Sequence, residues 1–259
     1  MPRPTILFTF LTLSLASILI APLAAQDTHA IATRPVLEPF FPPSCGTVDA
    51  QLQSTDGTLS PAYEQHLDTD RIQKAIDRCG KGRALTLRVD EQRNAFLTGP
   101  LTLRPDVALI LGRGVTLFAS SDPRQFDLSP GSCTVVNGLP SGCKPLISVS
   151  HATGDGIMGD GVIDGRGRVA RLISVDNSDN FTLYRITLHN LTGLNLTFDH
   201  GKGLTVWGVH VNAPDGATGK TGGIAIGSAA RNVGIASSYI DSASGQTEIE
   251  LSGVQQSAP

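Results

Sequence analysis

The chain has 259 residues, of which 40% are hydrophobic and 17% are charged, and its formal net charge is −3. This length and composition suffice for one domain with a real hydrophobic core. The mild negative charge and the absence of a basic run argue against a nucleic-acid-binding protein, so no nucleic-acid partner is expected.

The first 25 residues have the parts of a secretory signal peptide. Arg3 precedes an apolar stretch from Ile6 to Ile20, and small residues lead up to Ala25. The alternative is a membrane anchor, but the apolar stretch is short and interrupted by Thr and Ser, and no other segment is long enough to span a bilayer. We expect residues 1–25 to be a signal peptide, and the mature protein to be exported to a periplasmic, extracellular or cell-wall location without a stable membrane anchor.

Four cysteines, an even number in an exported chain, indicate two disulfides. Three pairings are possible. Cys133 and Cys143 lie close together in the sequence, which favours a small tied loop and leaves Cys45 to pair with Cys79. The cysteine spacing matches no zinc pattern, so we expect neither a metal nor a cofactor.

Residues 26–67 contain several prolines and are expected to form an extended lead-in. One helix is expected at 68–80, with Asp68 or Thr69 at its N-cap. Its apolar residues fall at i, i+3, i+4 and i+7 and are Ile72, Ala75, Ile76 and Cys79. We expect this helix to cap the first coil of a β-domain that extends over 68–259.

Short strands with period-2 apolar alternation recur between residues 145 and 253. Their spacing is regular: 22 positions from Leu172 to Leu194, 23 from Phe181 to Leu204, 23 from Ile186 to Val209, 30 from Leu194 to Ile224, 29 from Leu204 to Val233 and 25 from Ile224 to Ile249. The three strands of each turn recur together with this spacing, which predicts an all-β fold, a right-handed parallel β-helix. The alternative is a two-sheet β-sandwich, which does not keep such a register.

A glycine-rich run, Gly159 to Gly167 (G-D-G-V-I-D-G-R-G), resembles the G-x-G-x-I-D-G-x-G run of glycoside hydrolase family 28, the polygalacturonases. Residues 68–77, 132–147 and 204–209 also resemble segments of that family, in the same order. The resemblance covers roughly residues 44–253 and implies the same β-helix. Glycines permit positive φ at tight corners, so this run is architectural, and Asp164 is expected to be a turn residue.

The resemblance implies inverting hydrolysis of galacturonan, which needs two carboxyl functions about 6.5–9.5 Å apart. The family carries its acids in N-T-D-G and G-D-D motifs, with G-H-G and R-I-K motifs further on. At the matching positions this chain has Gly222, Gln246 and Thr247, and the two later motifs do not appear. We therefore expect a degenerate, C-terminally truncated family member with an incomplete β-helix and without the hydrolytic step, because these side chains cannot act as carboxylic acids.

Four other acids are the fallback catalytic candidates: Asp215, Asp241, Glu248 and Glu250. Lys220 and Arg231 are weak candidates for binding an acidic sugar, and His189, His200 and His210 are expected at the surface or at corners. The implied partner is an acidic polysaccharide, pectin or galacturonan.

Three functional classes therefore stay open. The first is an active exported pectin hydrolase, and the second is a non-catalytic carbohydrate-binding β-helix or truncated pseudoenzyme. The third is a pectate lyase, which would need a carboxylate-rich calcium site, and the sequence has no such cluster. An uncovered last coil would also favour self-association of the chain.

Overall fold

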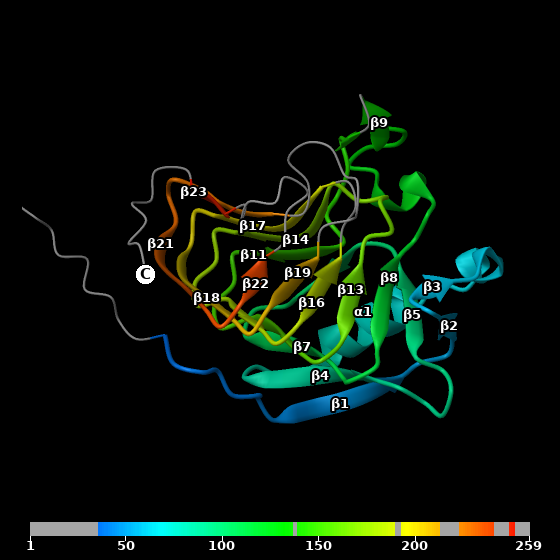
Figure 1. The fold of residues 1–259 in the computed structure, drawn as a ribbon, viewed down its shortest axis with the longest axis horizontal. Helices are drawn as coiled ribbons and strands as arrows, with labels where there is room; N and C mark the ends of the chain where they lie inside the picture. The colour runs from blue at the N-terminus through cyan, green and yellow to red at the C-terminus, as the bar shows by residue number, and fades with distance from the viewer. Residues whose placement is uncertain (1–35, 137–138, 190–192, 213–222, 241–248, 252–259) are drawn as a thin grey trace, which may run out of the picture. The chain divides into compact units, whose positions relative to one another are not determined.

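A computed structural model describes residues 36–136, 139–189, 193–212, 223–240 and 249–251 (Figure 1). Parallel strands stack in three sheets, and each turn of the chain adds one strand to each sheet. The fold is the expected right-handed parallel β-helix rather than a sandwich.

The first sheet has seven strands: β1 (Ser44–Asp49), β4 (Arg83–Arg88), β7 (Val107–Leu111), β12 (Gly156–Gly159), β15 (Thr182–Tyr184), β18 (Lys202–Trp207) and β21 (Arg231–Ala236). The second sheet has six: β6 (Leu101–Thr102), β11 (Ile147–Ser150), β14 (Arg171–Asp176), β17 (Leu194–Asp199), β20 (Ile224–Ile226) and β23 (Ile249–Leu251). The third sheet also has six: β5 (Ala95–Thr98), β8 (Thr116–Ala119), β13 (Val162–Asp164), β16 (Thr187–His189), β19 (His210–Asn212) and β22 (Tyr239–Ile240).

The remaining elements are short. Two antiparallel pairs are β2 (Ser54–Thr55) with β3 (Thr58–Leu59), and β9 (Thr134–Val136) with β10 (Leu139–Ser141). The helices are η1 (Pro61–Gln65), α1 (Thr69–Arg78) and η2 (Pro123–Phe126). Both expected disulfides are present, Cys45–Cys79 and Cys133–Cys143.

The core is a stack of aliphatic side chains in register from coil to coil. In the first sheet, Leu109, Ile157, Leu183 and Val206 occupy equivalent positions on successive strands, and all four are fully buried. Burying a side chain of this size contributes about 1.5–3 kcal/mol. Because each coil buries its apolar face only against its neighbours, the period-2 pattern and the coil spacing together specify the fold.

The coil spacing that we predicted from the sequence was wrong in one sheet. The expected steps of 22 and 30 residues assumed that Leu194 is a core residue equivalent to Leu172 and Ile224. The structure instead pairs Ile173 with Leu196 and Leu196 with Ile224, so the steps are 23 and 28. Leu194 is only half-buried, whereas Leu196 is fully buried and is the true core position. The steps of 23, 29 and 25 in the other comparisons are confirmed.

The β-helix begins earlier than expected. β1 lies inside the range expected to be an extended lead-in, yet it pairs in parallel with β4. Its sequence gives little sign of this because Val48 is its one buried side chain. Helix α1 occupies Thr69–Arg78, slightly less than the expected 68–80, and it buries Ile72 and Ile76 as expected.

Helix α1 covers the first coil, and its side chains form hydrogen bonds with backbone groups that a neighbouring strand would otherwise bind. The amide of Gln73 donates to the Thr102 carbonyl and accepts from the Thr102 N–H, at 3.0 and 2.9 Å. Thr69 Oγ1 accepts from the Gly99 N–H at 2.7 Å, and Asp68 Oδ2 accepts from the Leu97 N–H at 3.0 Å. Asp68 stands at the N-cap but makes no side-chain capping bond to its own helix, because its carboxylate serves the strand edge instead.

An N-terminal strap, residues 36–43, crosses the outside of the first sheet. Glu38 Oε1 accepts a hydrogen bond from the Tyr184 hydroxyl at 2.7 Å, and the Phe41 ring lies 5.2 Å from the Tyr184 ring. Near β21, a Cβ on Gly234 would lie 2.6 Å from Val36 Cγ2. The strap therefore contacts both a middle strand and the last strand of this sheet before the chain enters β1.

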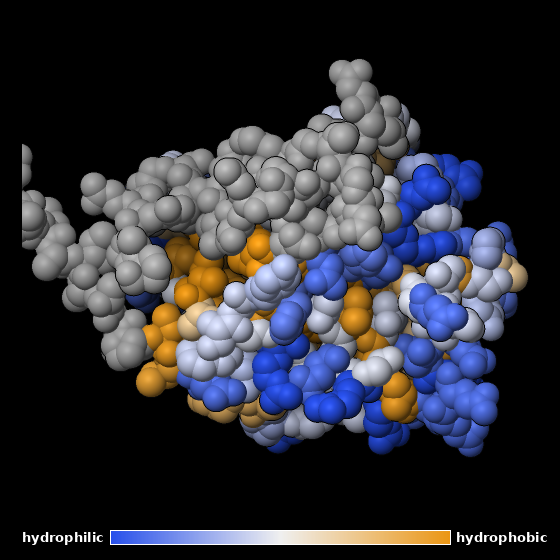
Figure 2. Space-filling view, in the orientation of Figure 1, coloured by the Kyte–Doolittle hydropathy of each residue, from blue (hydrophilic) through white to orange (hydrophobic). Residues whose placement is uncertain are grey.

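Core side chains of the last described coil are less covered than those before it. Val233 and Ile235 of β21 are half-buried, whereas Leu204 and Val206, their partners on β18, are at most 1% exposed. Figure 2 shows hydrophobic side chains at the surface on the left of the view, near β18 and β21, while the right-hand side of the same view is largely hydrophilic. Self-association through this end stays a prediction.

In the part of the chain that the structure describes, no helix has the length and apolar character needed to cross a membrane.

Candidate functional site

The strands that follow the two candidate acid motifs are direct neighbours. β20 and β23 run in parallel in the second sheet, with Ile224 beside Ile249 and Ala225 beside Glu250. Residues 220–223 precede β20 in the sequence, and residues 245–248 precede β23. The strands that follow the two motif segments in the sequence are therefore neighbours in the second sheet, while residues 220–222 and 245–248 themselves lie outside the described residues.

Most of the candidate catalytic and sugar-binding positions lie outside the described residues. These are Asp215, Lys220, Gly222, Asp241, Gln246, Thr247 and Glu248. Glu250 is the middle residue of β23, and its backbone pairs with that of Ala225. The roles of all these candidate residues, Glu250 included, stay predictions.

Arg231 is described, and it lies at the corner between β20 and β21. Its guanidinium donates to the backbone carbonyls of Ser228 and Ala230, both at 2.8 Å. Arg231 begins β21 and pairs with Lys202 in the first sheet, not in the sheet that holds β20. In this structure the side chain therefore stabilises a turn, while its role in binding an acidic sugar stays a prediction.

The outer face of the second sheet carries a row of hydroxyl groups upstream of β20. Ser148, Ser174 and Thr197 are in register on successive strands, and Ala225 continues the row. Thr197 Oγ1 donates to Ser174 Oγ at 3.1 Å. Residues on either side of each row position, such as Val175 and Phe198, are fully buried in the core. Alternation along the strand therefore turns the hydroxyl row away from the core.

A second row on this face carries carboxylates that the sequence reasoning missed. Asp176 and Asp199 end β14 and β17 and are in register. Asp176 Oδ1 lies 3.1 Å from His200 Nδ1, and Asp176 Oδ2 accepts from the Asn177 side-chain amide at 2.9 Å. The available signal was their separation of one coil, 23 residues, at the outward position that ends each strand.

Gly227 lies beside the second of these carboxylates, because a Cβ there would stand 2.0 Å from Asp199 Oδ1. The carboxylate of Asp199 thus occupies the space next to the end of β20. Two neighbouring acids and a row of hydroxyls give this face groups that can accept and donate hydrogen bonds to a polyhydroxylated ligand.

A carboxyl with a raised pKa lies elsewhere, in the corner between β11 and β12. Burial raises the pKa of Asp155 to about 6, and the nearby charge of Asp106 adds to the rise. A pKa near the working pH suits a general acid, but the Asp155 side chain is only 2% exposed. Its Oδ1 accepts from the Val107 N–H at 3.0 Å. A polymer therefore has no access to this group, which makes it a structural feature.

The glycine-rich run forms a polar corner next to the third sheet. Asp164 Oδ1 accepts from the Arg166 N–H at 2.7 Å, which is the expected role of a turn residue. Asp164 Oδ2 lies 3.6 Å from Nδ1 of His189 on the neighbouring strand, and this carboxylate raises the pKa of His189 because it accepts a proton-bearing nitrogen as its partner. Arg166 forms an ion pair with Glu64 at 2.5 Å, and this pair joins the run to η1.

The histidines expected at the surface or at corners are placed accordingly. His200 and His210 are exposed, and His189 is partly exposed beside Asp164.

No protein-family model matches the chain. Among curated proteins, the chain is 32% identical over 225 residues to an endo-polygalacturonase of Pectobacterium carotovorum subsp. carotovorum, covering 77% of this chain and 52% of that protein. It is also 32% identical over 218 residues to a polygalacturonase of Ralstonia nicotianae, covering 69% of this chain and 41% of that protein. The chain thus spans about half the length of the curated relatives it matches.

Solved structures agree with these sequence matches. The polygalacturonase from Erwinia carotovora ssp. carotovora superposes with a TM-score of 0.66 at 33% identity, covering 80% of this chain and 57% of that one. The family 28 exopolygalacturonase of Yersinia enterocolitica superposes with a TM-score of 0.58 at 18% identity, covering 78% of this chain and 43% of that one. The second likeness supports the fold alone.

Proposed function

Because the chain belongs with the polygalacturonases of glycoside hydrolase family 28, we propose that it is an exported protein that binds pectic galacturonan but lacks the hydrolytic step. The proposal rests on the 32% identity to polygalacturonases combined with Gly222, Gln246 and Thr247, which the motif resemblance places at the positions of the family's acids. The sequence identity indicates the class of ligand, and the three residues account for the expected loss of hydrolysis.

The loss of hydrolysis follows from what these side chains can do. An inverting glycosidase needs one carboxylic acid to protonate the leaving oxygen and one carboxylate to activate water across the sugar ring. Glycine has no side chain, and the amide of Gln246 and the hydroxyl of Thr247 do not give up a proton near neutral pH. Both motif segments are affected, so neither half of the acid–base pair is supplied at the family positions.

Export is supported by two observations. The apolar stretch that ends near Ala25 has the features of a signal peptide. The two disulfides are typical of proteins that fold in an oxidising compartment.

The test measures binding and cleavage separately. The mature chain is sedimented with insoluble polygalacturonate and, in parallel, assayed for release of reducing ends from the soluble polymer. We expect sedimentation with the polymer and no release of reducing ends. Absence of sedimentation overturns the proposed ligand. Cleavage by the natural chain overturns the proposed loss of chemistry and directs attention to Glu248 and Glu250.

A triple variant, Gly222→Asp with Gln246→Asp and Thr247→Asp, restores acids at the family positions. Cleavage by this variant and not by the natural chain would show that the three positions alone account for the missing step. If neither chain cleaves while both bind, the three positions alone do not account for the missing step.

A further inference from the structure

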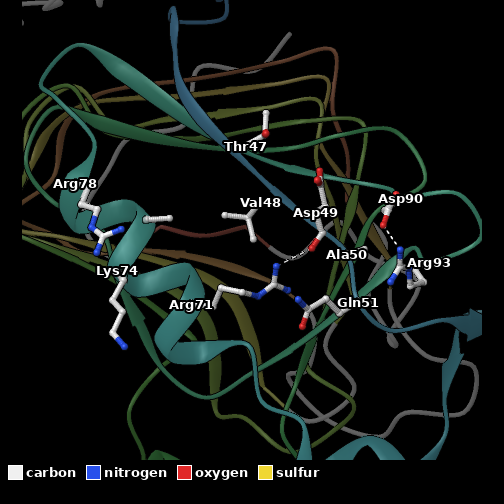
Figure 3. A pocket seen from close by; sticks show the side chains of 11 residues that line it. Thr47, Val48, Asp49, Ala50, Gln51, Arg71, Lys74, Arg78, Asp90 and Arg93 are labelled. Atoms are coloured by element: carbon white, nitrogen blue, oxygen red, sulfur yellow. Dashed lines mark hydrogen bonds and ion pairs between the residues drawn. The ribbon is translucent and has the colours of Figure 1, made fainter.

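A surface hollow of about 550 Å³ lies between α1 and β1 (Figure 3). It is distinct from the second sheet that holds the candidate site, because its walls come from α1, from β1 with the two residues that follow it, and from Asp90 and Arg93. β1 is the terminal strand of the first sheet. The hollow is thus at the N-terminal end of the coil stack.

One stripe of α1 supplies most of its positive charge. Arg71, Lys74, Ala75 and Arg78 all line the hollow, and their spacing of i, i+3, i+4 and i+7 places them on one helix face. This stripe is adjacent to the one that buries Ile72 and Ile76 in the core. At 1.5 Å per residue, Lys74 and Arg78 are about 6 Å apart along the helix axis.

The positively charged side chains that line the hollow differ in whether a neighbouring residue already binds them. Arg71 is held by Asp68 and donates to the Asp49 carbonyl at 2.7 Å, and Arg93 is paired with Asp90. The side chains of Lys74 and Arg78, in contrast, are exposed and make no hydrogen bond or ion pair with any residue in the described ranges. In Figure 3 no dashed line reaches either side chain.

The acids that line the hollow do not balance these two charges. Asp90 is taken by Arg93, and Asp49 is taken by Arg88 at 2.8 Å. Two positive charges on neighbouring turns of α1 therefore have no carboxylate partner among the residues that line the hollow, and they favour an anionic ligand.

The opposite wall offers backbone groups. Ala50 points its N–H to Arg88 on β4, at 2.8 Å. Backbone groups alternate in direction along a strand, so those of Thr47 and Asp49 point to the other edge, where the first sheet has no further strand and where Arg71 already donates to the Asp49 carbonyl. The Cys45–Cys79 disulfide joins the start of β1 to the residue that follows α1. Both walls are therefore fixed before a ligand arrives, which lowers the entropic cost of binding.

We propose that this hollow is a second binding site for an acidic oligosaccharide. Lys74 and Arg78 take carboxylates of different uronate residues, and the free edge of β1 takes hydroxyl groups. The class of ligand rests on the proposed function, whereas the location rests on the geometry of α1 and β1. A polymer held here and at the outer face of the second sheet would be bound at two points, which raises its overall affinity without any new contact.

The test is calorimetric titration of the mature chain with tetragalacturonate at low salt. The double variant Lys74→Gln/Arg78→Gln removes the two free charges. A matched control, Arg113→Gln/Lys144→Gln, removes one Arg and one Lys that are exposed and lie outside the hollow. A charge-preserving variant, Lys74→Arg/Arg78→Lys, separates loss of charge from loss of shape.

We expect the first variant to weaken binding about tenfold, since two exposed charge contacts are lost. The control should change the Kd less than twofold, and the charge-preserving variant should retain most of the affinity. Binding should also weaken as salt rises, because exposed charge pairs are screened. Equal affinity of the natural chain and the Lys74/Arg78 variant would overturn the proposal.

Two further probes define the ligand and separate this proposal from the function. A neutral galactose tetramer should not bind, and inorganic phosphate should bind more weakly than tetragalacturonate. Equally tight phosphate binding would make the hollow a general anion site and would overturn the assignment to acidic sugars. If the chain sediments with polygalacturonate and the Lys74/Arg78 variant sediments equally well, the hollow is excluded while the proposed function stands. If the natural chain does not sediment at all, the proposed function fails.

Discussion

The buried carboxyl of Asp155 should make the stability of the protein fall as the pH rises towards neutral. The carboxyl is 2% exposed, and its Oδ2 has no hydrogen-bond partner among the described residues. Burial raises its pKa from 3.8 to about 6. The folded state therefore binds the proton more tightly than the unfolded state, and this group stabilises the fold at low pH. Its contribution is lost as the pH rises from about 4 through 6.

The size of the effect follows from the shift. At 1.36 kcal/mol per pKa unit, the change from 3.8 to about 6 corresponds to about 3 kcal/mol, of which roughly 2–3 kcal/mol is lost between pH 4 and pH 8. Asp155→Asn keeps an acceptor for the Val107 N–H and removes the charge. The variant carries its own cost, about 1–3 kcal/mol, because part of its amide is buried without a partner. The pH dependence is therefore more informative than the stability at one pH.

The assay is urea unfolding at several pH values for the natural chain, Asp155→Asn and a control, Asp56→Asn, in an exposed turn. We expect the stability difference between Asp155→Asn and the natural chain to shift by about 2–3 kcal/mol in favour of the variant from pH 4 to pH 8. The control should run parallel to the natural chain. Parallel profiles for Asp155→Asn would refute the reasoning, because they would show that burial does not raise the pKa of this carboxyl.

Three further outcomes are expected. Replacing both cysteines of the Cys45–Cys79 bridge by Ala should cost about 3.5–4 kcal/mol in urea unfolding, against about 2.5–3 kcal/mol for the other bridge, because the closed loops span 34 and 10 residues; equal costs would contradict the loop-entropy argument. Gly201→Ala places a Cβ 2.2 Å from the Ser178 carbonyl oxygen and should cost about 1–3 kcal/mol or more; an unchanged midpoint would show that the coil can yield there. Asp164 raises the pKa of His189, so this pair stabilises the fold below the pKa that His189 has in the unfolded chain, and the gain disappears as the pH rises through its pKa in the folded protein. His189→Gln should therefore lose more stability at pH 5 than at pH 9. An equal loss at both pH values would exclude the ion pair.

The sequence was most informative where one rule governs every coil. Each coil must place an aliphatic residue at the same inward position, so Leu183 and Val206 reveal the register without any knowledge of the structure. The rule failed at Leu194, because a strand can begin with a half-buried apolar residue that resembles a core position. It also failed at β1, a terminal strand with one buried side chain, which lacks the alternation of a strand between two neighbours.

The candidate site was harder to predict because it depends on side chains outside the core. Outward positions follow no hydrophobic rule, so Asp176 and Asp199 were indistinguishable from ordinary surface acids until the register brought them together. Asp68 occupies the predicted N-cap position, but its carboxylate makes no capping bond, for a related reason. Local sequence suggested a bond to its own helix, but the open strand edge at Leu97 competes for the same carboxylate.

The strap at residues 36–43 has a consequence for the order in which the protein folds. Its contacts join residues that are far apart in the chain, with 146 positions between Glu38 and Tyr184. Synthesis proceeds from the N-terminus, so the strap emerges long before β15 and β21 exist to receive it. Coils can add one by one through neighbour contacts, but this segment must wait until most of the stack is complete. The part of the domain made first is therefore among the last to be fixed, and it connects coils that otherwise touch only their neighbours.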